Sequence, residues 1–92
     1  MSQTDVSAAT ATATGTIVNQ PARVKSIYFV SSATAGTLSF RNGGAGGTEL
    51  IRIDTPAGIG DVTVYIPDNG VRFTANVHVT MTNTTSVTIF YG

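Results

Sequence analysis

Apolar and polar residues alternate along most of this chain in short runs with a period of two. Residues 37–41 show the pattern most clearly, because Leu38 and Phe40 are separated by polar residues. The β-branched residues Val, Ile and Thr, which favour extended backbone, are abundant. No window of about a dozen residues shows the 3.6-residue period of an amphipathic helix. The pattern therefore predicts strands throughout and no helix.

Clusters of Gly, Pro, Asn and Asp separate the runs and mark the turns between strands. About eight short strands are expected, at residues 14–19, 22–32, 37–41, 48–54, 61–66, 70–74, 76–82 and 86–91. The connections are too short to hold a crossover helix, so neighbouring strands should pair antiparallel. The predicted fold is all-β: a single antiparallel β-sandwich or small barrel with jelly-roll or Greek-key connections.

The inward-facing positions of these strands define a predicted core. In most runs every second residue is Val, Ile, Leu or Phe, as expected for a strand with one buried face. The residues expected to be buried are Leu38, Phe40, Ile51, Ile53, Val62, Val64, Val71, Phe73, Val79 and Ile89.

The first 14 residues differ from the rest, because they contain one Val and no aromatic residue. Such a stretch cannot bury enough apolar surface to offset the entropy lost on ordering. Residues 1–14 are therefore predicted to be a flexible N-terminal arm, and residues 15–92 the β-sandwich domain. Alternatively, the alternation of Thr and Ala in residues 10–14 suits a strand that orders only against a partner.

Charge is sparse: five Lys and Arg balance five Asp and Glu, and 11% of residues are charged, against about 25% in an average domain. A nucleic-acid partner is not expected, because the basic residues are too scattered to form a basic face. Cysteine is absent, so disulfides cannot stabilise this small domain. Self-association is the remaining means of stabilising it, and a poorly charged surface suits a protein packed against others.

The sequence contains few residues that could form a catalytic or metal site. His78 is the single histidine and falls on the predicted polar face of its strand, where we expect an exposed structural side chain. Asp54 and Asp61 flank one loop, and a Ca²⁺ site there is conceivable because calcium prefers oxygen ligands. Residues 43–47 are Gly-rich, but no Lys follows and the next segment is a strand, so a phosphate-binding loop is rejected. We therefore predict no enzyme, and no catalytic, cofactor or metal residues.

Large apolar residues outside the predicted core are the more informative signal. Phe90 faces away from Val87 and Ile89, and Tyr28 and Phe29 face opposite ways on one strand. Apolar groups on both faces of a strand indicate a contact with another subunit. The candidate interface residues are Tyr28, Phe29, Phe90, Ile59 and Val6.

Neither a membrane span nor a signal peptide is expected. The longest apolar run, residues 27–30, is far shorter than the roughly 20 residues needed to span a bilayer. The N-terminus lacks the basic and apolar blocks of a signal peptide. We expect no membrane partner and assembly in a cytoplasm.

About four fifths of the chain resembles a family of short virion-associated proteins of tailed bacteriophages, especially phages of marine and freshwater cyanobacteria. The shared features are an Arg-Val-Lys-x-Ile-Tyr strand, an Ala-Gly-Thr-Leu hairpin and an Asn-Gly-Gly-Ala-Gly-Gly-Thr loop, all within residues 15–56. The ending at residues 82–92 is similar as well. The resemblance implies a structural virion protein, and no functional residue is carried over from the family.

The function expected from this resemblance is capsid decoration or cementing. Such a protein would stabilise the head by binding the major capsid protein on the capsid surface, as a homotrimer at three-fold positions. One alternative is another virion part, such as a head-fibre base or tail component. A second is a small carbohydrate-binding module for host attachment, for which Tyr28 and Tyr65 are the candidate aromatic residues.

Overall fold

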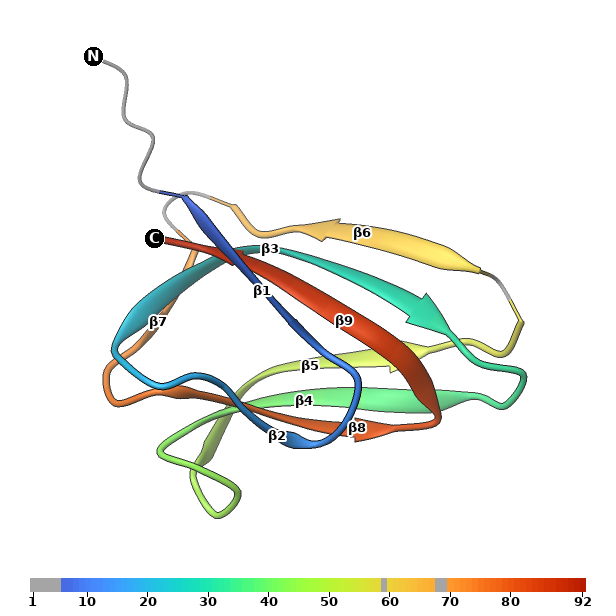
Figure 1. The fold of residues 1–92 in the computed structure, drawn as a ribbon, viewed down its shortest axis with the longest axis horizontal. Coiled ribbons are helices and arrows are strands. Elements are labelled where there is room, and N and C mark those ends of the chain that lie inside the picture. Colours follow the sequence, from blue (N-terminus) through green and yellow to red (C-terminus); the bar gives the residue numbers. More distant parts are fainter. Residues whose placement is uncertain (1–5, 59, 68–69) are drawn as a thin grey trace.

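In a computed structural model the chain forms a β-sandwich (Figure 1). The structure describes residues 6–58, 60–67 and 70–92. These residues form nine strands in two antiparallel sheets, and none of them is helical. The sequence-based prediction of an all-β antiparallel fold is therefore confirmed, and the sandwich is the form that it takes.

Each sheet combines segments that are distant in the sequence. The first sheet has the order β1 (Ser7–Ala11), β9 (Thr84–Tyr91), β3 (Ala22–Ser31), β6 (Asp61–Tyr65), with β7 (Val71–Phe73) also paired to β3. The second sheet has the order β2 (Gly15–Val18), β8 (Val77–Thr82), β4 (Gly36–Asn42), β5 (Thr48–Thr55).

The strand pairs are nested around the β4–β5 hairpin. Moving outward, β3 pairs with β6 and β7, β2 pairs with β8, and β1 pairs with β9. The chain is thus one long antiparallel ribbon whose successive strand pairs lie in alternate sheets, as the crossing strands in Figure 1 show. This is the jelly-roll arrangement, in which β6 and β7 together occupy one strand position.

The core lies between the sheets, and part of its prediction is confirmed. Leu38, Phe40, Phe73, Val79 and Ile89 are fully buried. The core contains seven further apolar residues that the predicted set omits, mostly from β3 and the ends of neighbouring strands. They are Val18, Ala22, Val24, Ile27, Phe29, Val77 and Val87.

The other half of the predicted core is only half-buried. These residues face inward and pack against the core, but they lie on β5, β6 and β7 at the margins of the sheets. A residue on an edge strand has a neighbour on one side only, so water reaches its side chain. The residues concerned are Ile51, Ile53, Val62, Val64 and Val71.

The predicted boundary between a flexible arm and the domain is wrong, because residues 7–11 form β1. This strand pairs with β9 from Ser7 opposite Tyr91 to Ala11 opposite Val87. Ala9 and Ala11 pack against the core, and the pairing with β9 supplies backbone hydrogen bonds. These backbone hydrogen bonds cannot be predicted from the side chains of residues 7–11. Residues 1–5 of the predicted arm lie outside the described residues.

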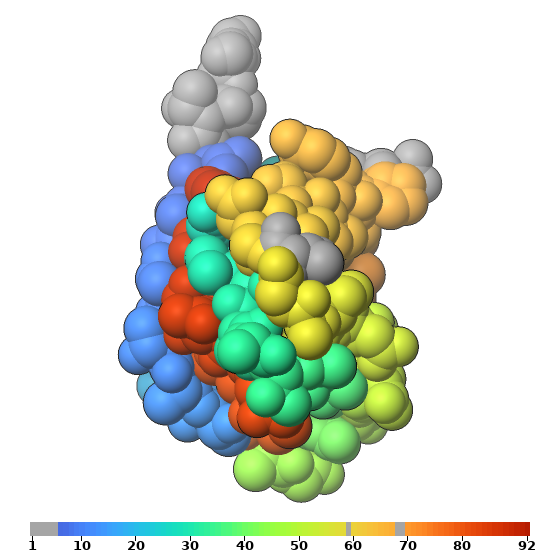
Figure 2. Space-filling view, turned by 90° about the vertical axis from the view of Figure 1, so that its right-hand side faces the viewer, coloured from blue at the N-terminus to red at the C-terminus, as the bar shows by residue number. Residues whose placement is uncertain are grey.

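The sandwich has two flanks, each formed by an edge strand from each sheet. One consists of β1 and β2, which contact each other and appear in blue in Figure 2. The other consists of β5 and β6, which appear in yellow-green and gold on the opposite side of that view.

Candidate functional site

The outer face of the first sheet carries three aromatic side chains in two neighbouring rows. Strand register places Phe90 of β9 between Ala8 of β1 and Ser26 of β3, and Ser26 lies opposite Tyr65 of β6. The next row on the same face lies two residues further along each strand, and each of its side chains carries a hydroxyl group. Its members are Thr10, Thr88, Tyr28 and Thr63. The residues of this face come from four strands, so only the folded sheet brings them together.

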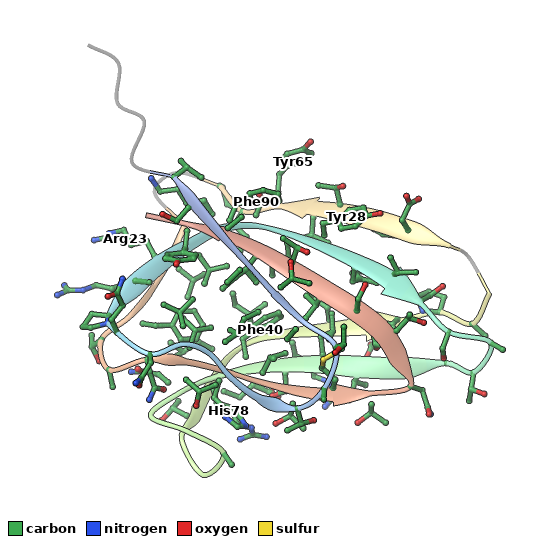
Figure 3. All side chains as sticks on the ribbon, viewed as in Figure 1. Arg23, Tyr28, Phe40, Tyr65, His78 and Phe90 are labelled. Atoms are coloured by element: carbon green, nitrogen blue, oxygen red, sulfur yellow. The ribbon has the colours of Figure 1, made fainter. Side chains whose placement is uncertain are left out.

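These side chains border an open groove of about 580 Å³. We call it the aromatic groove, and its lining residues are Val6, Lys25, Ser26, Tyr28, Thr63, Tyr65 and Phe90. Figure 3 shows Tyr28, Tyr65 and Phe90 projecting from the same side of the first sheet, away from Phe40 in the core. The volume lies within the range of roughly 300–1,000 Å³ found for small-molecule sites.

A hydrogen bond orients one wall of the aromatic groove. The Tyr28 hydroxyl donates to Oδ2 of Asp61 at 3.1 Å. This hydrogen bond, with smaller contributions from desolvation and from the charge of Asp61, raises the pKa of Tyr28 above its ordinary value. The phenol is protonated at neutral pH and donates to the carboxylate.

Two lining residues at opposite edges of the first sheet are strongly exposed. Tyr65 is 81% exposed and Val6 is 53% exposed. Free Tyr and Val side chains at this level leave apolar surface in water, which a bound partner would remove. The aromatic groove therefore combines exposed apolar surface with polar side chains.

The structure brings together most of the predicted interface residues and excludes one. Tyr28, Phe90 and Val6 all line the aromatic groove. Phe29 is 2% exposed and belongs to the core, so its prediction as an interface residue is wrong. Phe29 does face away from Tyr28, as the sequence predicts. Its side chain points into the core, however, on a strand position between Val62 and Val87. Ile59 lies outside the described residues.

Sequence reasoning missed part of the groove. The sequence pattern indicates Tyr65 only as a candidate for sugar binding and does not indicate Lys25, Ser26 or Thr63. Polar residues facing outward on strands are common, so nothing in the sequence distinguishes these three. The β3–β6 register, which sets Ser26 opposite Tyr65, is the missing information.

A second apolar surface lies along the flank formed by β5 and β6. We call it the open flank and define it by its half-buried inward residues, Ile51, Ile53, Val62 and Val64. In the described residues β5 pairs only with β4, and β6 pairs only with β3, so both outer edges are open to a further strand.

The prediction that His78 is exposed is wrong. Its exposed fraction is 7%, although it lies on the outer face of the second sheet, away from Phe40 (Figure 3). β8 is an interior strand, and Thr16 of β2 and Arg41 of β4 flank His78 in the ladder. Neither ring nitrogen has a hydrogen-bond partner among the described residues.

The two acids considered for calcium are engaged separately. Asp54 Oδ1 lies 3.6 Å from Arg52 Nε, and Asp61 accepts the hydrogen bond from Tyr28. In the described part of the chain, no three His, Cys, Asp or Glu residues are grouped so as to hold a metal ion.

The Gly-rich loop binds a side chain of its own chain. The backbone amides of Gly43 and Gly44 both donate to Oδ1 of Asn76 at 3.1 Å. Both glycines have positive φ angles, 102° and 93°, which bring the two amides to one acceptor. These amides therefore fasten the β4–β5 hairpin to the start of β8.

Among the described residues there is no helix long and apolar enough to cross a membrane.

The strand order defines the class of protein as a small jelly-roll β-sandwich. Comparisons with family models, with curated proteins and with solved structures find no match to this chain.

Proposed function

We propose that the protein is a non-enzymatic structural protein of a bacteriophage virion that decorates or cements the capsid. In this role it binds the major capsid protein on the capsid surface, after assembly in the host cytoplasm, and associates with itself as a homotrimer. The observation that carries the proposal is the open flank, where large aliphatic side chains remain half-exposed beside two unpaired strand edges.

The two flanks of the sandwich differ in the size of their apolar side chains. The open flank presents Ile and Val side chains, whereas the opposite flank presents Ala9 and Ala11 on β1 and Ile17 on β2. Small residues leave room for the large aliphatic groups of a neighbour. A contact between two different flanks is head-to-tail, and such contacts close into rings when the rotation permits. Three copies are proposed because the resemblance of the sequence implies capsid three-fold positions.

The architecture is compatible with this role. Jelly rolls recur in viral capsid proteins and in lectins, although a fold by itself does not define a function. The sequence resemblance to virion-associated proteins of tailed phages supports the virion location. The balanced charge of five basic and five acidic residues supports a partner bound through apolar surface rather than through nucleic-acid phosphates.

Quantitative mass spectrometry of purified virions tests the location. Hundreds of copies for each virion support capsid decoration, whereas about a dozen or fewer support a head-fibre base or a tail component. Absence of the protein from purified virions would overturn the proposal.

A pair of variants on β6 tests the self-association. Val62 faces the open flank, and its neighbour Thr63 faces the opposite side of the first sheet. We expect Val62→Lys to give a monomer in analytical ultracentrifugation and Thr63→Lys to remain a trimer. Circular dichroism checks that both variants are folded. A wild-type protein that stays monomeric at micromolar concentration, or a Val62→Lys trimer, would contradict the proposed contact.

A further inference from the structure

We infer that the aromatic groove binds an uncharged glycan made of hexopyranose units. This inference goes beyond the proposed capsid attachment, because it assigns a ligand class to the outer face of the first sheet, whereas the proposed self-association uses the flanks.

The lining of the groove matches the two-sided chemistry of a sugar ring. A hexopyranose has flat C–H faces and a rim of hydroxyl groups. The faces of aromatic rings carry negative partial charge and attract polarised C–H groups. Tyr28, Tyr65 and Phe90 provide three aromatic side chains around one groove (Figure 3).

Polar groups stand beside the aromatic side chains. Ser26 and Thr63 supply hydroxyls that both donate and accept, and Lys25 supplies an ammonium donor. The Tyr28 hydroxyl is already bound to Asp61, and its oxygen retains capacity to accept from a ligand hydroxyl. A few placed polar groups in a mainly apolar groove are typical of small-molecule sites.

The composition of the face favours a sugar over a protein. Its largest apolar side chains are aromatic, and the surrounding positions on β1, β3, β6 and β9 are mainly Ala, Ser and Thr. Val30 and Asp61 lie on the same face, two positions beyond Tyr28 and Thr63. Aliphatic side chains gather instead on the open flank, which carries Ile51, Ile53, Val62 and Val64. The two surfaces therefore suit different partners.

The charge of the groove argues for an uncharged ligand. Lys25 is the one basic side chain among the lining residues, and Asp61 beside Tyr28 contributes the opposite charge. Single-stranded nucleic acid also stacks on aromatic residues, but its binding grooves are strongly basic along the backbone path. One lysine does not provide such a path.

The side chains of the aromatic groove are held in position before a ligand binds, because they project from paired strands. β3 and β9 are interior strands of the first sheet, and residues on regular strands are held more firmly than residues on loops. Little conformational entropy should be lost at Tyr28 and Phe90 on binding.

Nuclear magnetic resonance titration of the full chain with maltohexaose, cellohexaose and hexa-N-acetylchitohexaose tests the inference. We expect at least one of these oligosaccharides to shift the backbone resonances of Ser26, Thr63, Tyr65 and Phe90. Tyr65→Ala removes one of the three aromatic rings and should weaken that binding about tenfold, which corresponds to about 1.4 kcal/mol. Tyr65→Phe retains the ring and should bind within about twofold of the wild type.

Leu50→Ala provides a matched control, because Leu50 is an exposed apolar residue on the second sheet. It should leave the affinity for the oligosaccharide unchanged. Absence of shifts at the groove with all three oligosaccharides would overturn the inference, as would equal affinity of the Tyr65→Ala and wild-type proteins. Shifts at the groove that appear on raising the protein concentration alone would show that a second copy occupies it, which would also overturn the inference.

The outcome is separable from that of the proposed function. Val62→Lys should abolish the trimer and leave oligosaccharide binding intact, because Val62 faces the opposite side of β6 from Thr63 and Tyr65. Loss of sugar binding in the folded Val62→Lys monomer would overturn the assignment of the groove as a site within one subunit.

Discussion

At the level of single residues, the neighbours that a side chain meets decide its role more than its own chemistry does. Tyr28 is an exposed phenol by sequence pattern, but in the structure it donates to Asp61 across the β3–β6 pair. His78 shows the opposite case, because its polar ring is buried between Thr16 and Arg41. A buried donor or acceptor without a partner is destabilising, so His78 does not contribute to stability through hydrogen bonding with the described residues.

The hydrogen bond between Tyr28 and Asp61 predicts a pH effect. Because the carboxylate favours the protonated phenol, the pKa of Tyr28 lies above its ordinary value of 10.0. The stability that this bond contributes is present below that value and is lost as the pH rises through the raised pKa. We expect Asp61→Asn to return the pKa toward its ordinary value.

Ultraviolet absorbance of the ionised phenol measures this change, and a parallel titration of Tyr28→Phe assigns the signal to Tyr28. Asp54→Asn is the control, since Asp54 is paired with Arg52. An unchanged titration in Asp61→Asn would show that the hydrogen bond does not set the pKa.

The fully buried Phe40 predicts a large loss on truncation. It lies between Val79 of β8 and Ile51 of β5 and has no exposed surface. Phe40→Ala should lower the free energy of unfolding by roughly 3–5 kcal/mol, measured by urea denaturation. Leu50→Ala, at an exposed position, should change it by less than about 1 kcal/mol. Equal losses in the two variants would contradict the core placement of Phe40.

At the level of elements, the crossings between sheets depend on close backbone approach. Asn83 links β8 of the second sheet to β9 of the first with a φ angle of 48°, which Asn tolerates better than most residues. Its side-chain amide donates to the carbonyl oxygen of Ala35 at 3.1 Å. The same corner brings Gly36 against the backbone of Thr82.

Gly36 is therefore predicted to be intolerant of a side chain. A methyl group there would overlap the carbonyl oxygen of Thr82, which cannot move without disturbing the β8–β9 corner. We expect Gly36→Ala to destabilise the protein by about 1–3 kcal/mol, as overpacking does. Gly15→Ala is the control, because no atom lies within 4 Å of the added group. A thermal midpoint of Gly36→Ala equal to that of Gly15→Ala would refute this account.

At the level of the whole molecule, an assembly through the flanks makes stability depend on protein concentration. Near the melting temperature, a subunit released from the trimer unfolds, and a tenfold rise in concentration then stabilises each subunit of a trimer by about 0.9 kcal/mol. The thermal midpoint should then rise by roughly 4–7 °C, measured by scanning calorimetry. The midpoint of Val62→Lys should not depend on concentration, and a constant midpoint in the wild type would contradict assembly-dependent stability.

The period-two alternation by itself determined the fold class, the approximate strands and the most deeply buried residues such as Phe40 and Phe73, because strand periodicity is a local property of the chain. The pairing of β1 with β9 could not be obtained this way, since β1 contains small residues and its partner is the last strand. The half-burial of Ile53 and Val64 and the burial of Phe29 and His78 also follow from which strands are interior and which are edges. The aromatic groove combines residues of several strands whose register depends on long-range pairing. Only the tertiary structure decided these features, because a strand's sequence specifies which residues share a face but not which strand lies beside it.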